Sequence, residues 1–339
     1  MGETNTLTVN PLPTLTWNHL MVNFANMPLE AADGAAAEIP EEFAGIETGM
    51  GEEFAKFVQE HKAAVKIIST EKGEDAGVVK DDKAGEAAEI ILIHAAADSR
   101  LTFYSHVSGE TRKSQILRLI KVIADERSQV TVIQSQTTGD DVMIGDDFGA
   151  EVGDEASVHL IQVEIGGKAA FAGGCAALKG YKSDFTEETI YFGDKKRRLD
   201  FNYVTRHTGK KTTTSMTANG ALFGDADKVY RGSMDFIHGC SKSKGREAEN
   251  VLLFSPTARN RTIPLILCDE EDVDGQHAAS IGKINKDLMY YMQSRGLSES
   301  QARQLAVESR FNPVIDQMPD EAVKQEIHES LERRMNLDG

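Results

Sequence analysis

Two cysteines and one histidine are the residues of this sequence best suited to bind a metal. Cys240 follows a His-Gly pair, and Cys268 closes an apolar run. An acidic stretch, Asp269–Asp272, comes next, and His277 follows it. Thiolate and imidazole groups both bind iron and zinc. A lone cysteine after an apolar run is more often a small buried residue, so packing is the competing role for these side chains.

No motif of a self-sufficient catalytic or metal site occurs. The sequence lacks a Walker A loop, a GxGxxG loop, a nucleophile elbow, an HExxH motif and a CxxC pair, each of which marks a specific chemistry. The pairs Gly166-Gly167 and Gly173-Gly174 are interpreted as turns or close backbone approaches. The acidic stretch lacks the glycine turn of a calcium loop. We therefore expect a non-catalytic chain without its own ATP-hydrolysing machinery.

Charge restricts the partners of the chain. Its 339 residues carry a net charge of -17, which disfavours nucleic acid and anionic membranes as partners. The one basic run, Lys195–Arg198, is interpreted as a solvated turn. The N-terminus has no signal-peptide pattern, and no apolar run approaches the ~20 residues of a membrane span. Three widely spaced cysteines argue against a disulfide framework and favour a reducing cytoplasm.

The middle of the chain, from about residue 89 to 265, must supply the framework for these residues. Short runs rich in Val, Ile, Thr, Phe and Tyr recur there, and in Ile161–Ile165 apolar and polar residues alternate as in a half-buried strand. Only Ser114–Arg127 is predicted to be helical in this part. Many short strands indicate a sandwich, a barrel or a β-solenoid. No repeat of fixed length is evident, so the pattern leaves these three open.

The two ends differ from this middle. Apolar residues near one face predict a helix over residues 52–66, residues 30–50 are expected to form a linker or loose cap, and residues 70–88 a surface loop. Near the C-terminus, Asn285 can cap a helix that Gly296 ends. Ser298 and Gln301 form a capping-box pattern at the start of a second helix, and a third runs to about Met335. Such helices after a long β region indicate a small docking subdomain.

Several short motifs in the last third, taken in order, carry a resemblance to a known family. They are an aromatic-Arg-Gly turn, a Leu-rich strand, a Thr-x-Pro strand, a His-x-Ala-Ser box and a Tyr-Tyr-Met-x-Ser-Arg-Gly helix end: Tyr230–Gly232, Glu249–Leu253, Arg261–Ile266, His277–Ser280 and Tyr290–Gly296. Over about 110 residues their order and spacing resemble the C-terminal half of the SufB/SufD family of iron–sulfur cluster assembly proteins. Pro13-Thr14 with Trp17, Leu20 and Asn23 is similar to the family's N-terminal motif.

The resemblance implies a mainly β fold, a right-handed parallel β-helix with N-terminal and C-terminal helical regions. It implies an N-terminal cap region over 1–88, a β-helix core over 89–265, and final strands with a helical ATPase-docking subdomain over 266–339. The partner would be a SufC-type ABC ATPase, bound through the first C-terminal helix with the residues Tyr290, Tyr291, Arg295 and Gly296.

The resemblance also implies a scaffold that holds an iron–sulfur cluster transiently and passes it to apoprotein acceptors. Candidate metal ligands are Cys268, His277, Cys240 and Glu249. The sequence departs from the family where SufB has an essential cysteine, since Glu249 stands there, and Ala278 and Gly275 replace a SufB glutamate and a SufD cysteine. We therefore expect a SufD-like subunit, or the single scaffold of a minimal system.

The identity of the dimer partner and two alternative functions remain open at this point. The chain could form a homodimer, or a heterodimer with a SufB-like paralogue, through β-helix edges near the C-terminal strands. It could be an adaptor of an ABC ATPase that binds no cluster. It could also be a polysaccharide-acting β-helix enzyme, which would require carboxylates gathered on one face.

Overall fold

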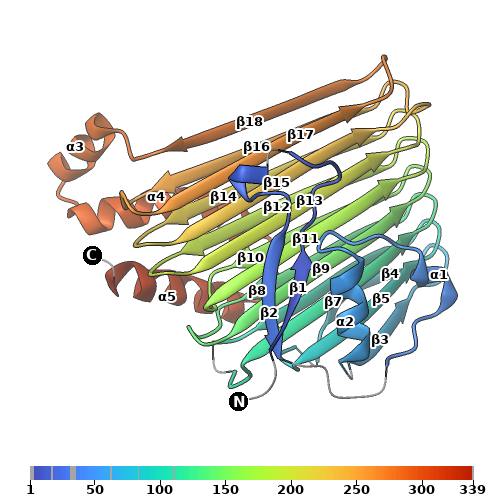
Figure 1. The fold of residues 1–339 in the computed structure, drawn as a ribbon, viewed down its shortest axis with the longest axis horizontal. Coiled ribbons are helices and arrows are strands. Elements are labelled where there is room, and N and C mark those ends of the chain that lie inside the picture. Colours follow the sequence, from blue (N-terminus) through green and yellow to red (C-terminus); the bar gives the residue numbers. More distant parts are fainter. Residues whose placement is uncertain are drawn as a thin grey trace.

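The computed structural model describes residues 4–16, 18–30, 36–61, 63–82, 84–109 and 111–337. Two eight-stranded parallel sheets dominate it, and the chain alternates between them to form a β-solenoid (Figure 1). The odd sheet contains β3 (Ala64–Ser69), β5 (Ala88–Ala95), β7 (Gln115–Ala124), β9 (Met143–Val152), β11 (Ala169–Leu178), β13 (Arg198–His207), β15 (Asp227–Phe236) and β17 (Arg259–Cys268). The even sheet contains β4 (Asp75–Lys80), β6 (Arg100–Val107), β8 (Gln129–Gln136), β10 (Ser157–Glu164), β12 (Asp184–Gly193), β14 (Thr213–Leu222), β16 (Lys244–Leu253) and β18 (Asp274–Gly282). The parallel β-helix is thereby confirmed.

The coils vary in length, which explains why no fixed repeat is visible. Ser157 pairs with Asp184, Asp184 with Thr213 and Thr213 with Lys244, so successive coils are 27, 29 and 31 residues long. What repeats is the turn that leads from each odd strand to the next even strand. In six successive coils one non-glycine residue of this turn has a positive φ: Asp98, Arg127, Glu155, Lys182, Lys211 and Lys242. The repeat is conformational, and sequence comparison alone does not detect it.

Both outer faces of the solenoid are partly covered. β1 (Thr4–Val9), β2 (Ala25–Glu30), the short helix η1 (Asn18–Leu20), α1 (Glu41–Ala44) and α2 (Glu52–Glu60) come from the N-terminal part. Phe43, Phe54 and Phe57 of this part pack on outward residues of the odd sheet. Of the C-terminal helices, α3 (Lys286–Ser294), α4 (Glu299–Ile315) and α5 (Glu321–Leu337), the last two pack on the even sheet. Figure 1 shows the N-terminal elements in front of the strands.

Three predictions for the region before residue 130 are wrong. The helix predicted over 52–66 ends at Glu60, and β3 follows it. The predicted loop over 70–88 contains β4, and the first coil therefore falls within the range assigned to the N-terminal cap. The segment 114–127 is not a helix but contains β7, whose residues are buried between the solenoid interior and the N-terminal part. A strand buried on both faces shows no clear alternation.

The predicted caps of the C-terminal helices are confirmed. Asn285 accepts a hydrogen bond from the backbone N–H of Asp287, and Gly296 adopts a φ of 93° after the end of α3. Ser298 and Gln301 form a complete capping box at the start of α4. The basic run forms the predicted solvated turn only at Lys195 and Lys196. Arg197 is buried and pairs with Asp194 at 3.0 Å, and Arg198 begins β13. The Trp17 of the N-terminal motif lies outside the described residues.

No helix in the described parts of the chain is long and apolar enough to span a membrane.

Candidate functional site

The last coil of the solenoid lies open to solvent. β17 and β18 are the terminal strands of the two sheets. The residues of β18 are almost all exposed and those of β17 mostly half-buried, whereas the preceding strands are largely buried. Ile266 packs toward the interior core. Side chains two residues apart on a strand lie on the same face, so Cys268 also faces the interior. The open coil therefore gives solvent a route to interior-facing residues.

Cys268 is an exposed free thiol at the end of β17. Its Sγ donates to the backbone oxygen of Glu270 at 3.1 Å. The thiol borders a hollow of about 600 Å³ whose walls include Phe236, Ile266 and the acidic residues of the β17–β18 turn. An exposed thiol beside a hollow can reach a ligand without rearrangement of the core.

Cys240 lies in the turn one coil below, which stacks on the β17–β18 turn. The backbone N–H of Gly239 donates to a Glu270 carboxylate oxygen at 2.9 Å, and that of Lys242 to the Asp272 carbonyl at 2.5 Å. Cys240 itself is buried. Burial raises the pKa of its thiol, and negative charge on nearby Glu270 and Cys268 raises it further. The structure thus brings Cys240 and Cys268 into neighbouring turns, with Cys240 held as the neutral thiol.

His277 occupies an exposed position on β18, in register with Glu247 on β16. Gly275, two residues earlier, faces Phe236 and Ile266, since a Cβ there would lie 3.1 and 3.3 Å from their side chains. Side chains alternate along a strand, so His277 also faces the interior side. It is not among the residues that border the hollow beside Cys268.

Glu249 is fully buried and its two oxygens already accept hydrogen bonds. Oε1 accepts from the Tyr191 hydroxyl at 2.7 Å and from the Lys228 ammonium, while Oε2 accepts from the Thr262 hydroxyl. Burial lowers the pKa of Lys228, and the charge of Glu249 offsets this effect only in part. The structure therefore places Glu249 in a closed ion-pair network and not beside Cys268.

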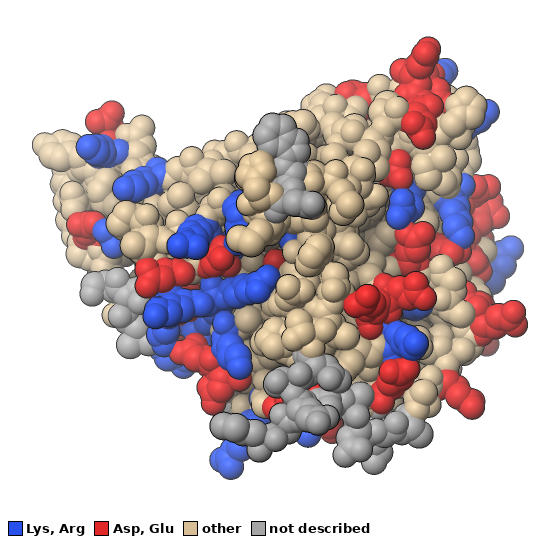
Figure 2. Space-filling model, in the orientation of Figure 1, with Lys and Arg blue, Asp and Glu red and all other residues tan. Residues whose placement is uncertain are grey.

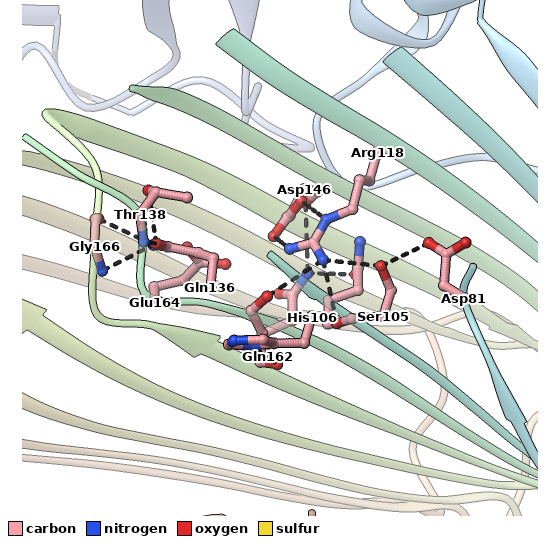
Figure 3. Close-up of polar contacts among 12 residues, drawn as sticks. Asp81, Ser105, His106, Arg118, Gln136, Thr138, Asp146, Gln162, Glu164 and Gly166 are labelled. Atoms are coloured by element: carbon pink, nitrogen blue, oxygen red, sulfur yellow. Dashed lines mark hydrogen bonds and ion pairs between the residues drawn. The ribbon is translucent and has the colours of Figure 1, made fainter. Parts of the chain in front are cut away.

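Polar side chains form a row along the solenoid interior, here called the file, which was not predicted from the sequence. Figure 3 shows one end of it, where Arg118 forms a bidentate ion pair with Asp146 and donates to Ser105 at 3.2 Å. Gln136 donates to Glu164 at 2.8 Å within the same group. Further along, Tyr203 donates to Gln162 and Thr189 donates to Tyr203. A charged residue at an inward position of an apolar strand is the sequence signal that could have revealed this file.

Burial raises the pKa of several carboxyl groups in this file. The pKa of Glu89 rises to about 8, mainly through burial and then through the charge of Asp81. Burial also raises the pKa of Glu164 and Glu187, and that of Glu247 to about 8. These groups are thus neutral over a wider pH range than an exposed carboxyl group.

The first C-terminal helix presents an apolar surface. Leu288, Tyr290 and Tyr291 are 50%, 76% and 54% exposed, while Met292 is buried. The guanidinium of Arg295 lies over the Tyr291 ring, 5.2 Å from its centroid. A hollow of about 300 Å³, bordered by Tyr290 among others, lies between α3, α4 and the end of β16. Packing within the chain accounts for Met292 but not for the two tyrosines.

No three His, Cys, Asp or Glu side chains of the described residues are arranged to hold a metal ion. The predicted ligands Cys268, His277 and Cys240 all lie at the open end, but they do not form a complete site within one chain. A second chain or a solvent molecule would have to complete it.

The family model for the SUF system FeS cluster assembly, SufBD core domain, matches residues 78–310. The iron–sulfur cluster assembly protein SufD of Bacillus subtilis is 30% identical over 148 residues, 44% of this chain and 34% of that protein. An iron–sulfur cluster assembly SufBD family protein of Mycobacterium leprae is 22% identical over 226 residues, and one of Mycobacterium tuberculosis 21% over the same length. Each match covers 64% of this chain, and 58% and 57% of the two relatives respectively. The chain thus spans less than two thirds of each relative.

Proposed function

Because the chain belongs to the SufBD core family of the SUF iron–sulfur cluster assembly system, we propose that it is a scaffold subunit that acts with a SufC-type ABC ATPase. In this proposal the chain is non-catalytic, works in the cytoplasm, holds a cluster transiently and passes it to apoprotein acceptors. The observation that carries the proposal is the open last coil, where an exposed thiol borders a hollow.

Cys268 and His277 are the proposed primary ligands of the cluster. Thiolate and imidazole are suitable iron ligands, and both side chains are accessible at the open end. Cys240 is a secondary candidate, since its buried thiol has a raised pKa and would require the turn to open. Glu249 is the weakest of the four, because a ligand role would break its ion pair with Lys228.

A dimer formed through the terminal strands would supply each ligand twice. β17 and β18 end their sheets, and the residues of β18 from Gly275 to Gly282 carry no charged side chain. In Figure 2 the edge of the molecule along β18 is correspondingly mostly uncharged. An unprotected edge of this kind pairs readily with another strand. The proposed partner strand belongs to a second copy or to a SufB-like paralogue.

Anaerobic reconstitution with iron and sulfide tests the scaffold role. The double variant Cys268→Ser/His277→Ala should retain several-fold less iron and sulfide per dimer than the wild type, with little change in thermal stability. Cys175→Ser is the matched control, because Cys175 is a buried thiol of β11 whose pKa burial raises to about 12. Wild-type cluster content in the double variant would support the adaptor alternative, in which the chain positions an ATPase without binding a cluster.

A further inference from the structure

Glu247 of β16 is a buried carboxylate with an unused oxygen. The side chain is 1% exposed and reaches across the interior to Gly232 of β15, where an added Cβ would lie 2.6 Å from the Glu247 Cδ. Its Oε2 has no hydrogen-bond partner among the residues that the structure describes. A buried polar atom left without a partner costs about 1–3 kcal/mol, so its retention calls for an explanation.

The neighbouring carboxylate, Glu249, differs in this respect. Both of its oxygens accept hydrogen bonds, from Tyr191, Lys228 and Thr262. These contacts occupy both oxygens of Glu249. Glu247 is thus the carboxylate of β16 with an oxygen available for a ligand.

His277 lies one coil above Glu247. The two residues are direct partners in the parallel ladder between β16 and β18, and neighbouring strands are about 4.8 Å apart. Both face the interior side, and His277 is exposed because β18 is the terminal strand. The position across the interior from Glu247 is a glycine, Gly232, with Pro264 in register above it. An ion that enters at the open coil therefore meets the imidazole first and the buried carboxylate next.

We propose that Glu247 and His277 together bind ferrous iron as it enters the scaffold. Carboxylate and imidazole are a suitable donor pair for a divalent iron ion, and water or a second chain would complete the coordination. Because burial raises the pKa of the Glu247 carboxyl group to about 8, iron binding at neutral pH would release its proton. Binding would also give the Glu247 Oε2 the partner that it lacks. The inference rests on the proposed scaffold function, for which it names a metal-entry site that is separate from the thiol of Cys268.

Titration of the full-length apoprotein with Co²⁺, a spectroscopic stand-in for Fe²⁺, tests this inference in the absence of sulfide. Glu247→Gln should weaken Co²⁺ binding by about tenfold or more, since even the loss of a residue that only supports a metal ligand costs about 10–100-fold in affinity, and His277→Ala should do the same. Glu187→Gln is the matched control, since Glu187 is also buried and has an unpartnered Oε2, two coils deeper. It should bind Co²⁺ as the wild type does.

Two results would overturn the inference. One is wild-type Co²⁺ affinity in a folded Glu247→Gln variant, and the other is an equal loss of affinity in Glu247→Gln and Glu187→Gln. If Glu247→Gln does not fold, Glu247→Asp, which retracts the carboxylate by one methylene, replaces it with the same expected loss. Cys268→Ser separates this inference from the scaffold function. This variant should keep wild-type Co²⁺ affinity and lose cluster content. If only the scaffold function is wrong, Cys268→Ser will keep wild-type cluster content, and Glu247→Gln will still bind Co²⁺ more weakly than the wild type.

Discussion

At the scale of single residues, the chain places ionisable groups inside a parallel solenoid and joins some of them in ion pairs. Arg118 and Asp146, and likewise Lys228 and Glu249, are fully buried ion pairs. Burial of such a pair gains little net stability, but loss of one member leaves an uncompensated charge in the interior. Glu89 belongs to neither pair, and its environment favours the neutral acid, as burial also does for Glu164, Glu187 and Glu247. A bound proton thus removes the negative charge of Glu89, where an ion pair would offset it with a cationic partner.

Glu89→Gln should make the protein less sensitive to pH. The folded state holds the pKa of Glu89 at about 8, against a usual value of 4.5. The stability that this group contributes is complete below pH 4.5 and is lost as the pH rises to 8, because the unfolded chain releases its proton first. At about 1.4 kcal/mol per pKa unit, the wild type should lose on the order of 3 kcal/mol relative to Glu89→Gln between pH 5 and pH 8.

Urea unfolding at several pH values measures this difference. The glutamine amide can still donate to Asp81, as the protonated acid does, so the variant should fold. If the free energies of unfolding of the two proteins change in parallel between pH 5 and pH 8, the prediction is wrong and Glu89 is ionised in the folded state.

Candidate site residues could be named from the sequence only in part. Cys268 and His277 were found because their residue types are rare. Cys268 precedes the acidic stretch, and His277 follows it and begins the family-like box. Glu247 was missed, since a glutamate within a polar-looking strand carries no sign of burial. Its inward position depends on the register of β16 with β14 and β18. That register follows from coil lengths of 30 and 31 residues, which the sequence does not display.

At the scale of elements, the two ends of the solenoid differ. β4, at one end, has an irregular register between Asp75 and Val78 and a positive φ at Gly77, and Lys80 at its end pairs with Asp320 of the C-terminal part. Bulges and charges of this kind discourage edge pairing. β17 and β18, at the other end, are longer and pair regularly with their inner neighbours. This asymmetry favours association through the C-terminal strands.

Leu265→Lys should prevent that association. Leu265 lies on β17 with outward parity and is half-buried, so a lysine there can stay solvated in the monomer but not in a strand-paired interface. Sedimentation velocity should show a shift from dimer to monomer. Val78→Lys at the opposite end, where Val78 is 56% exposed, should leave the dimer intact. A dimer that persists in Leu265→Lys and dissociates in Val78→Lys would place the interface at the other end.

The apolar surface of α3 carries a separate prediction. Tyr291→Ala combined with Arg295→Glu should weaken retention of the SufC-type ATPase in a pull-down, because the variant removes an exposed ring and reverses the charge stacked on it. Tyr181→Ala, at an exposed tyrosine of the β11–β12 turn, is the control. Unchanged retention in the folded double variant would mean that the ATPase docks elsewhere. Circular dichroism should show the same β content in all three proteins.

Elements were predicted well where their physical signal is local. The caps of α3 and α4 depend on residues within one turn, and Asn285, Gly296 and Ser298 identified them. β7 was mistaken for a helix because its outward Leu117 and Leu119 pack under the N-terminal part, while its inward neighbours fill the interior. Only the three-dimensional arrangement shows that both faces of this strand are covered.

At the scale of the whole molecule, the N-terminal part ties distant coils together. Asn10 donates to the Asp200 side chain at 2.9 Å, the Val22 carbonyl accepts from Arg231, and Met50 donates to Asp147 at 2.8 Å. These contacts reach β9, β13 and β15. A bare solenoid is held mainly by contacts between adjacent coils and can unfold from its ends. The N-terminal part adds contacts that span several coils and should make unfolding more cooperative.

Gly49→Ala tests this coupling at its closest approach. A Cβ on Gly49 would lie 2.0 Å from the Gly174 nitrogen and 2.7 Å from the Asn202 carbonyl oxygen, so the backbone of the N-terminal part must lift off β11 and β13. Overpacking of this kind costs about 1–3 kcal/mol. Gly45→Ala is the control, since its added Cβ has nothing within 4 Å and its φ of -81° suits any residue. It should change stability by less than about 0.5 kcal/mol.

Hydrogen exchange combined with urea unfolding distinguishes local from global effects. If the N-terminal part couples the coils, Gly49→Ala should broaden the unfolding transition. It should also speed exchange in β15, which the N-terminal part contacts through Val22, and not only in β9, β11 and β13, which Gly49 contacts directly. The hydrogen bond from Asn202 to the Gly49 carbonyl, 2.7 Å long, should be lost at the same time. Faster exchange confined to residues near Gly49, with an unchanged transition, would instead mean that the coils hold together without this part of the chain.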